Sequence, residues 1–190
     1  MFPPQLVPKL ALASLLILGC TACTAISGGT TTIKPSPMNS YSADPDSEIG
    51  SRNNPVALGK SVVVNDWKVQ VTSVNPDAAK IVLKADPYTS PPSADERFLI
   101  IGVKATYIGE ESGEPSSDLR FKIVGSKGNT FAKSCGYSAD SFDSNGETFP
   151  GATVTGNLCF TVDQDQIKGS TVSIQQDYSS EGRKFVLIIP

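Results

Sequence analysis

Four cysteines are the residues of this 190-residue sequence whose chemistry is easiest to assign, and they fall into two pairs. Cys20 and Cys23 lie near the amino terminus, whereas Cys135 and Cys159 lie late in the chain. The spacing of the first pair is formally that of a redox Cys-x-x-Cys motif, which acts at a helix start beside a βαβ unit. Here the motif follows an apolar run instead, so we reject the redox interpretation.

The segment before Cys20 predicts export. Lys9 is its only charged side chain, and an apolar run from Leu10 to Leu18 follows. This run is too short to span a bilayer, which needs about 20 residues, but it has the length of a signal-peptide core. It ends in Ile17-Leu18-Gly19-Cys20, which resembles the bacterial lipobox. We therefore predict a lipoprotein signal peptide over residues 1–19 and lipidation of Cys20. That anchor would place the chain on the outer face of the cytoplasmic membrane.

Two alternatives stay open at this end of the chain. Leu18 departs from the lipobox, where a small residue is usual, and Cys23 follows Ala22, so Cys23 is a competing lipid acceptor. An ordinary secretory signal cut near Ala22 or Ala25 would also explain the apolar run. Each interpretation exports the chain, but they differ in whether and where it is anchored.

Composition excludes several classes of function. The sequence has no His, which is the commonest metal ligand and the side chain that titrates near neutral pH. Ser-His-Asp and Cys-His catalysis, His-ligated zinc and His-ligated haem are therefore excluded. The formal net charge of −3 does not supply the basic surface that nucleic-acid binding needs. No phosphate-binding loop, nucleophile elbow or dinucleotide fingerprint is present. We predict that the protein is not an enzyme and has no catalytic residue, cofactor or metal.

The acidic residues offer two weaker options. Asp140, Asp143 and Glu147 lie in a turn-rich stretch where a loose calcium site can be imagined, but Ala152 occupies the position where an EF-hand loop needs Glu. Paired carboxylates can also serve a glycosidase, yet most acids here lie beside Pro or Gly in predicted turns. We favour solvated turns in both cases.

The sequence divides into a predicted lipid-anchored flexible linker over residues 20–50 and one folded domain over residues 51–190. The linker is rich in Ser, Thr, Gly and Pro, so it cannot bury enough apolar surface to offset the entropy of ordering it. In the domain, apolar and polar residues alternate as in half-buried strands. Strands are expected at 62–65, 67–72, 80–84, 99–107, 119–123, 130–133, 154–162, 171–175 and 184–189, with one helical turn at 163–168. Gly, Pro and Asn turns separate most of these strands, which predicts an antiparallel sandwich or barrel.

A resemblance covers nearly all of this domain. It is carried by Asn54-Pro55-Val56-Ala57-Leu58-Gly59, by Asp66-Trp67-Lys68-Val69, by Arg97-Phe98-Leu99-Ile100, and by the long stretch from Phe149-Pro150-Gly151 to Thr155-Gly156-Asn157-Leu158-Cys159-Phe160. Together these resemble a bacterial, actinobacterial-type envelope domain family of uncharacterised function, similar in fold to the secreted mycobacterial immunoprotective antigen. The resemblance implies an immunoglobulin-like β-sandwich outside the cytoplasm and carries over no catalytic or binding residues. Tyr107-Ile108-Gly109 departs from the family pattern after the long strand.

The late cysteines are predicted to form a disulfide. If Cys20 is lipidated and Cys23 lies beside the anchor, Cys135 and Cys159 are the natural partners in an oxidising compartment. Cys159 alternates with Leu158 and Phe160, so its side chain should leave the opposite face of the strand, and the bond should lie along the surface of the sandwich. Two buried free thiols are the alternative.

Two functions remain in view for the domain. The first is a non-catalytic envelope module that engages another protein or a surface component, attached to the membrane by its lipid and not bound to nucleic acid. The alternative is an exported enzyme or small-ligand carrier. A solid core with an exposed edge strand would favour the first, and an apolar cavity with convergent polar groups would favour the second. Trp67 shares a strand face with Val69 and Val71 and is expected in the core rather than at a ligand.

Overall fold

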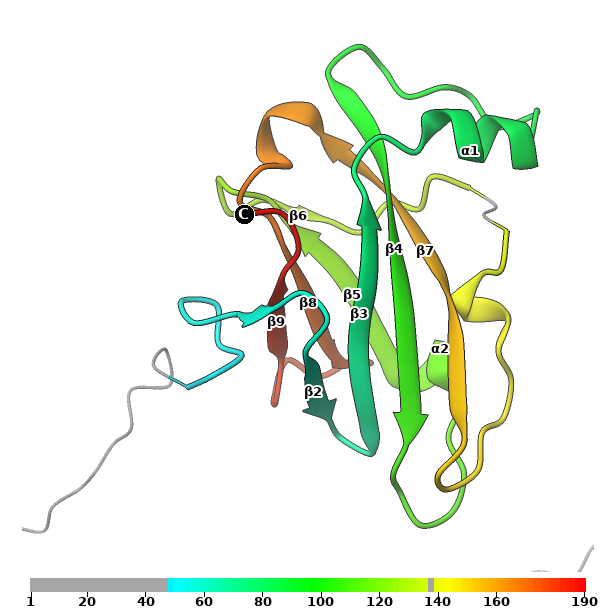
Figure 1. Cartoon of the computed structure of the whole chain (residues 1–190), viewed down its shortest axis with the longest axis vertical. Coiled ribbons are helices and arrows are strands. Elements are labelled where there is room, and N and C mark those ends of the chain that lie inside the picture. The colour runs from blue at the N-terminus through cyan, green and yellow to red at the C-terminus, as the bar shows by residue number, and fades with distance from the viewer. Residues whose placement is uncertain (1–47, 137–138) are drawn as a thin grey trace, which may run out of the picture. The chain divides into compact units, whose positions relative to one another are not determined.

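The computed structural model describes residues 48–136 and 139–190. These residues form a β-sandwich of two sheets, as predicted (Figure 1). One sheet has five strands in the order β1 (Val56–Ala57), β9 (Lys184–Leu187), β8 (Thr171–Gln176), β5 (Leu119–Val124) and β6 (Thr130–Phe131). The other has four in the order β2 (Ser61–Val64), β3 (Trp67–Asn75), β4 (Glu96–Tyr107) and β7 (Thr153–Asp163).

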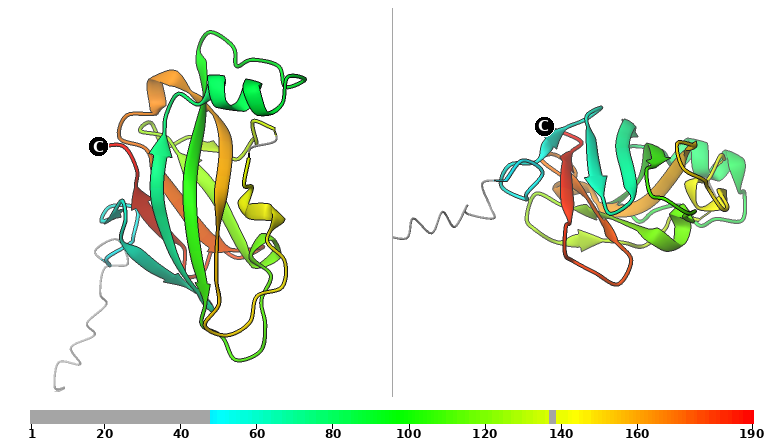
Figure 2. Two further views of the ribbon diagram at one scale, coloured as in Figure 1. Left: turned by 45° about the vertical axis from the view of Figure 1, so that its right-hand side comes forward. Right: turned by 90° about the horizontal axis from the view of Figure 1, so that it is seen from below.

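Pairing is antiparallel throughout both sheets except between β1 and β9, which run parallel. The longest ladder joins β4 to β7 over eleven residue pairs, from Glu96–Asp163 to Thr106–Thr153. The register of β3 against β4 shifts between Val71 and Ser73, where a bulge adds one residue and increases the local twist. The two sheets lie face to face (Figure 2).

Alternation explains which side chains fill the space between the sheets. Trp67, Val69 and Val71 of β3 are fully buried, and Trp67 confirms its predicted place in the core. The inward residues of the other long strands join them: Leu99, Ile101, Val103, Ala105, Leu158, Phe160, Val162, Ile123, Val172 and Ile174. Because successive side chains of a strand point to opposite faces, the intervening residues form the outer faces of the sheets.

The prediction of a strand at 80–84 was wrong. This stretch lies within helix α1 (Ala79–Ala85). The run Ile81-Val82-Leu83 is as apolar as a strand, but only Val82 is fully buried, together with Ala78 four residues earlier. That four-residue spacing is the repeat of one helix face, and the Ala, Leu and Lys residues around it favour helix. α1 lies against the outer face of the four-stranded sheet (Figure 1).

Short helical segments complete the fold. Helix α2 (Pro115–Asp118) leads directly into β5, and the 3-10 turn η1 (Phe142–Ser144) precedes β7. The turn η2 (Gln164–Gln166) falls within the helical turn predicted at 163–168. Strand β6 ends at Phe131, two residues earlier than expected, because the chain then crosses to β7, where the Thr161 N–H donates to the Lys133 carbonyl at 2.9 Å.

The domain includes residues that we expected in the linker. The Phe185 N–H donates to the Gly50 carbonyl at 2.7 Å, and Lys184 Nζ lies 2.6 Å from Glu48 Oε1. These contacts join residues 48–50 to the start of β9. A Ser/Gly-rich composition did not reveal this, because the main contact is made by the backbone.

Candidate functional site

The edges of the two sheets differ in how much of their backbone is paired. The edge strands are β1 and β6, of two residues each, β2 of four residues and β7 of eleven. An exposed edge carries unpaired N–H and C=O groups that can pair with another chain. The two longer edges, β2 and β7, are therefore the candidates for recognition.

Strand β7 is covered by its own preceding loop. The Asn157 N–H donates to the Asp140 carbonyl at 2.7 Å, and the Cys135 N–H donates to the Cys159 carbonyl at 3.3 Å. The side-chain amide of Asn145 donates to the Thr155 carbonyl at 3.1 Å. With the bond from Thr161 to Lys133, these contacts use outward-facing groups along most of the strand, so β7 does not present a free edge.

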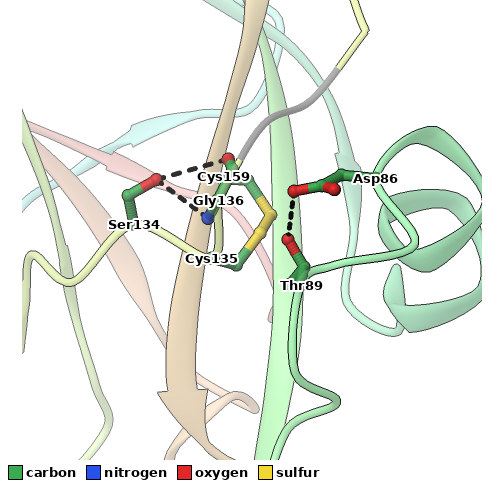
Figure 3. The surroundings of a disulfide bond; sticks show 6 residues. All are labelled: Asp86, Thr89, Ser134, Cys135, Gly136 and Cys159. Carbon is green, nitrogen blue, oxygen red and sulfur yellow. Dashed lines mark hydrogen bonds between the residues drawn. A yellow bond between two sulfur atoms is a disulfide. The ribbon is translucent and has the colours of Figure 1, made fainter.

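The disulfide holds this covering segment in place. Cys135 and Cys159 are joined, with their Cα atoms 5.5 Å apart, which is the pair expected from the sequence. Figure 3 shows the bond between β7 and the Asp86–Thr89 turn that follows α1. Across Cys135, the Gly136 N–H donates to Ser134 Oγ at 3.3 Å.

The disulfide is more buried than the sequence predicted. Cys159 does point away from Leu158 and Phe160, as expected, but it is only 6% exposed and Cys135 only 4%. Both join Ala78, Val82 and Phe98 in a second apolar cluster outside the main core. α1 covers the bond there, and the sequence did not predict this cover because it did not predict the helix.

Strand β2, in contrast, has an open edge. It pairs with β3 from Val64–Trp67 to Ser61–Gln70 across the two-residue turn Asn65-Asp66. Residues that flank such a turn form a hydrogen-bonded pair, and hydrogen-bonded pairs alternate along an antiparallel ladder. Val64 and Val62 therefore direct their backbone groups to β3, whereas Ser61 and Val63 direct theirs outward. Within residues 48–136 and 139–190, no hydrogen bond reaches these outward groups.

The side chains of β2 do not protect this edge. Val62 and Val64 are buried in the core, and Val63 is 52% exposed on the outer face. Edge strands commonly resist pairing through a charge, a proline or a bulge within the strand, and the sequence Ser61-Val62-Val63-Val64 has none of these. The nearest charges along the sequence are Lys60 and Asp66, which flank the strand at its two ends, and Lys68 lies opposite Val63 on β3.

A cleft of about 450 Å³ lies between β5 and β7. Its apolar lining includes four core residues that keep 4–8% of their surface exposed: Leu119, Phe121, Leu158 and Phe160. Its polar lining includes Ser134, Ser141, Asp143 and Asn157. Asp143 is the one carboxylate among the described lining residues, so the cleft does not bring together a pair of acids for glycosidase chemistry.

Arg120 is the one basic residue in the described lining of this cleft. Its Nε and Nη2 atoms donate to Asp177 Oδ1 at 3.0 and 2.8 Å. These hydrogen bonds are the main reason that the pKa of Arg120 is raised, and the negative charge of Asp143 adds to the effect. The guanidinium group is therefore paired with Asp177, the residue that directly follows β8.

The acids weighed as a loose calcium site do not form one. Glu147 accepts a hydrogen bond from Ser112 at 2.8 Å instead of turning toward Asp140 or Asp143. In the described part of the chain, no three His, Cys, Asp or Glu residues are grouped as metal ligands would be.

The predicted lipid acceptor Cys20 and its competitor Cys23 lie outside the described residues, as do the signal peptide over 1–19 and the linker as far as residue 47. Among the residues that the structure does describe, no helix has the length and apolar character needed to cross a membrane.

The open edge of β2 is the feature that sequence reasoning missed. The sequence predicted a short strand at 62–65, and the uncharged run from Ser61 to Asn65 was visible. Whether a strand is central or at an edge depends on which strands lie beside it. Here β3 pairs with β4 on one side and with β2 on the other, which places β2 at the end of the sheet. The residues of β2 itself do not reveal this position.

The fold thus defines an immunoglobulin-like β-sandwich with one covered long edge and one open short edge. A family model described as a domain of unknown function, DUF4352, matches residues 56–184. The chain belongs to this family. A comparison with curated protein sequences found no match.

Several solved structures are similar to this chain at low sequence identity. A secreted Mycobacterium tuberculosis protein, MPT63, is 15% identical with a TM-score of 0.50, and the match covers 72% of this chain and 98% of that one. This neighbour has the fold that the sequence resemblance implied. The yjhA protein of Bacillus subtilis is 17% identical with a TM-score of 0.46, covering 70% of this chain and 98% of that one. An uncharacterised β-sandwich protein of Clostridium difficile is 10% identical with a TM-score of 0.42, covering 70% and 94%.

Proposed function

We propose that this chain is an exported, lipid-anchored and non-catalytic module of the bacterial cell envelope that binds another polypeptide through the edge of β2. Cys20 would carry the lipid, and residues 20–47 would link the membrane to the sandwich. We assign no reaction, because Asp143 is the one acid among the described residues that line the cleft.

Two observations support export and anchoring. The run from Leu10 to Leu18, followed by Gly19-Cys20, resembles a lipoprotein signal. The disulfide between Cys135 and Cys159 is a bond that persists in oxidising compartments and is rare in the cytosol. Lipoproteins carry at least two acyl chains, and two chains anchor a protein stably where one does not.

The open edge of β2 is the observation that carries the binding function. Its outward groups are the N–H and C=O of Ser61 and Val63, which alternate along an extended backbone. Another extended polypeptide matches this arrangement, as in recognition by strand addition. The exposed Val63 side chain would then contact a residue of the added strand, and the hydrogen bonds would be formed in register along β2.

The anchor is tested by metabolic labelling of cells with a clickable fatty acid. The wild-type chain should be labelled and should fractionate with membranes, and Cys20→Ser should lose both properties. Cys23→Ser is the matched control and should behave as the wild type. Loss of label in Cys23→Ser alone would move the anchor to Cys23. Absence of label in the wild-type chain would overturn lipidation.

Partner binding is tested by a photocrosslinking amino acid placed at Val63 in the full chain on intact cells. Lys104, exposed on the outer face of the central strand β4, is the control position. We expect polypeptide adducts at position 63 and not at position 104. Equal adducts at both positions, or none at either, would contradict recognition through β2.

A small-ligand carrier is the second candidate, because the cleft between β5 and β7 reaches apolar core residues. Its volume is in the range of about 300–1,000 Å³ that ligand pockets occupy. Native mass spectrometry of the full chain should then show a retained small molecule. Ala132→Trp, at an exposed position in the cleft lining, should remove that molecule.

A further inference from the structure

We propose that the cleft between β5 and β7 is a second polypeptide site, which takes an extended segment with an acidic residue next to an apolar one. The segment would add to the edge of β5 where β6 has ended, and its apolar side chain would enter the cleft. This site is separate from the edge of β2, so the inference goes beyond the proposed function and does not depend on it.

β5 has an open stretch because its edge neighbour is short. β6 pairs with Ile123 and Val124 only. The first four residues of β5, 119–122, therefore have a neighbouring strand on the β8 side alone. The open edge of this sheet is longer than the two residues of β6 indicate.

The backbone of Phe121 faces this open side. At the end of the β5–β8 ladder, the Asp177 N–H donates to the Asp118 carbonyl at 3.1 Å. Because the residues of an antiparallel strand direct their backbone groups alternately to its two sides, Leu119 and Phe121 direct theirs away from β8. The Leu119 N–H donates to the Pro115 carbonyl. Among the described residues, no hydrogen bond reaches the N–H or C=O of Phe121 on this side, so both groups can pair with another backbone.

The cleft gives the added segment a place for an apolar side chain. A residue paired opposite Phe121 would exchange both backbone hydrogen bonds with it, and its side chain would leave the same face of the sheet as the Phe121 ring. That face is turned to the core, where the cleft is lined by Leu119 and Phe121 on one side and by Leu158 and Phe160 on the other. Burial of apolar surface there favours Leu, Val or Phe at this position of the segment.

Charge selects the residues beside the apolar one. Because successive side chains of a strand alternate, these residues would point to the outer face of the five-stranded sheet, where Arg120 and Lys122 flank Phe121. Arg120 is paired with Asp177, whereas Lys122 takes part in no ion pair in the part of the chain that the structure describes. Opposite charges on neighbouring strands favour pairing and like charges oppose it. An acidic residue therefore fits this edge better than a basic one.

Asp143 restricts where that acid can lie. It is the acid in the described lining of the cleft, and its negative charge acts on Arg120 in addition to that of Asp177. An acidic side chain that turned into the cleft would meet the like charge of Asp143. Lys122 on the outer face is thus the cation that remains for a ligand.

The test is photocrosslinking of a defined peptide to the full chain in detergent micelles. The probe is the end-blocked peptide Ser-Glu-Leu-Glu-Ser with a photoreactive leucine, and the matched peptide has Lys in place of both Glu residues. A four-residue edge buries little surface, so the peptides are used at high concentration. We expect the acidic peptide to label 119–121 or 158–160 several-fold more than the basic peptide does. Ala132→Trp, in the cleft lining, should remove the label, and Thr155→Trp, exposed outside it, should not.

Strand addition has a test of its own. Methylation of the leucine N–H removes the donor to the Phe121 carbonyl and should lower labelling several-fold. Methylation of the N–H of the next residue is the control, because that group would point away from β5. Equal labelling by the two methylated peptides would overturn strand addition at Phe121.

The charge argument is tested on the protein. Lys122→Glu should remove the preference for the acidic peptide, whereas Lys104→Glu, which makes the same charge change on the other sheet, should keep it. An unchanged preference in Lys122→Glu would overturn the role of Lys122. Melting temperatures show whether each variant is folded, so a loss of labelling through unfolding is recognised.

The outcomes also separate this inference from the proposed function. Labelling at 61–64 instead of the cleft, or no specific labelling at all, overturns the cleft site and leaves recognition through β2 to its own test at position 63. A small molecule retained in the cleft, with no peptide labelling after its removal, likewise overturns the inference. Labelling confined to the cleft supports it whether or not adducts form at position 63.

Discussion

The indole Nε1 of Trp67 donates a hydrogen bond of 2.9 Å to Oδ2 of Asp118. Trp67 begins β3 in one sheet, and Asp118 ends α2 just before β5 in the other. The same carboxylate oxygen accepts the Glu114 N–H at 3.0 Å, which closes the α2 turn. One polar contact thus connects the two sheets at the end of the core, where the Trp67 ring also meets Tyr107 edge to face at 5.0 Å.

We predict that Trp67→Phe lowers the free energy of unfolding by about 1–3 kcal/mol, because it removes the indole N–H from the partly buried Asp118 carboxylate and leaves that oxygen with the Glu114 N–H alone of these two donors. Denaturant unfolding of the variant measures this loss. Asp118→Asn is the control, since its side-chain oxygen can still accept from Trp67, and it should cost less. Equal stability of Trp67→Phe and the wild type would contradict a role for this bond.

Gly156 is predicted to tolerate no side chain. A Cβ there would lie 2.4 Å from Phe142 Cα, because the segment that covers β7 passes directly over it. Phe142 in turn packs against Phe121 at 5.6 Å in the core. Gly156→Ala should therefore destabilise the fold by about 1–3 kcal/mol through overpacking.

Gly146 supplies the matched control for this substitution. It lies between η1 and β7, in the chain that leads from Phe142 to Gly156, and a Cβ there would meet nothing within 4 Å. Gly146→Ala should change the unfolding free energy by no more than about 0.5 kcal/mol. If thermal melts show the same shift for both alanine variants, close contact with Phe142 is not what requires glycine at 156.

Glu96 is expected to make stability dependent on acid pH. Its carboxylate accepts hydrogen bonds from the Ser93 hydroxyl at 2.7 Å and the Ser93 N–H at 3.3 Å, and these bonds hold its pKa below the ordinary value of 4.5. Because the pKa is lower in the folded state, the stabilisation is present above the unfolded pKa and is lost as pH falls through the folded pKa. The melting temperatures of wild type and Glu96→Gln should therefore differ at neutral pH and converge in acid. A difference that is constant with pH would contradict this.

The amino-terminal boundary of the folded domain is predicted from the contacts of Glu48 and Gly50 with β9. Limited proteolysis of the mature chain, followed by mass measurement, should leave a resistant fragment that begins at or before Glu48. A fragment that begins after Arg52 would show that the contacts of residues 48–50 do not persist in solution.

Sequence alternation predicted most of the fold because most strands have one buried and one exposed face. It placed Leu158 and Phe160 in the core and Cys159 on the opposite face, as the structure does. It failed for α1, where a three-residue apolar run is compatible with either period and only the burial of Ala78 and Val82 shows the helix. It also could not show that the β7 edge is covered and the β2 edge open, because both depend on contacts between distant segments.

Removal of the disulfide is predicted to destabilise the domain and to uncover β7. The bond joins residues 24 positions apart, and chain entropy for a loop of this size gives about 3–4 kcal/mol. Cys135→Ala with Cys159→Ala should lose stability of that order in denaturant unfolding. Residues 133–136 and 139–145 would then be held on β7 by their hydrogen bonds and by the packing of Phe142 in the core, and their release would expose an eleven-residue edge to other chains. We therefore expect the double variant to aggregate on warming, below the temperature at which its core melts.

Two charged variants test which edge causes this aggregation. Thr155→Lys places a charge at an exposed position on β7 and should suppress the aggregation, whereas Val63→Lys on β2 should not. Suppression by Val63→Lys alone would show that the chains associate through β2 and that the disulfide does not protect β7.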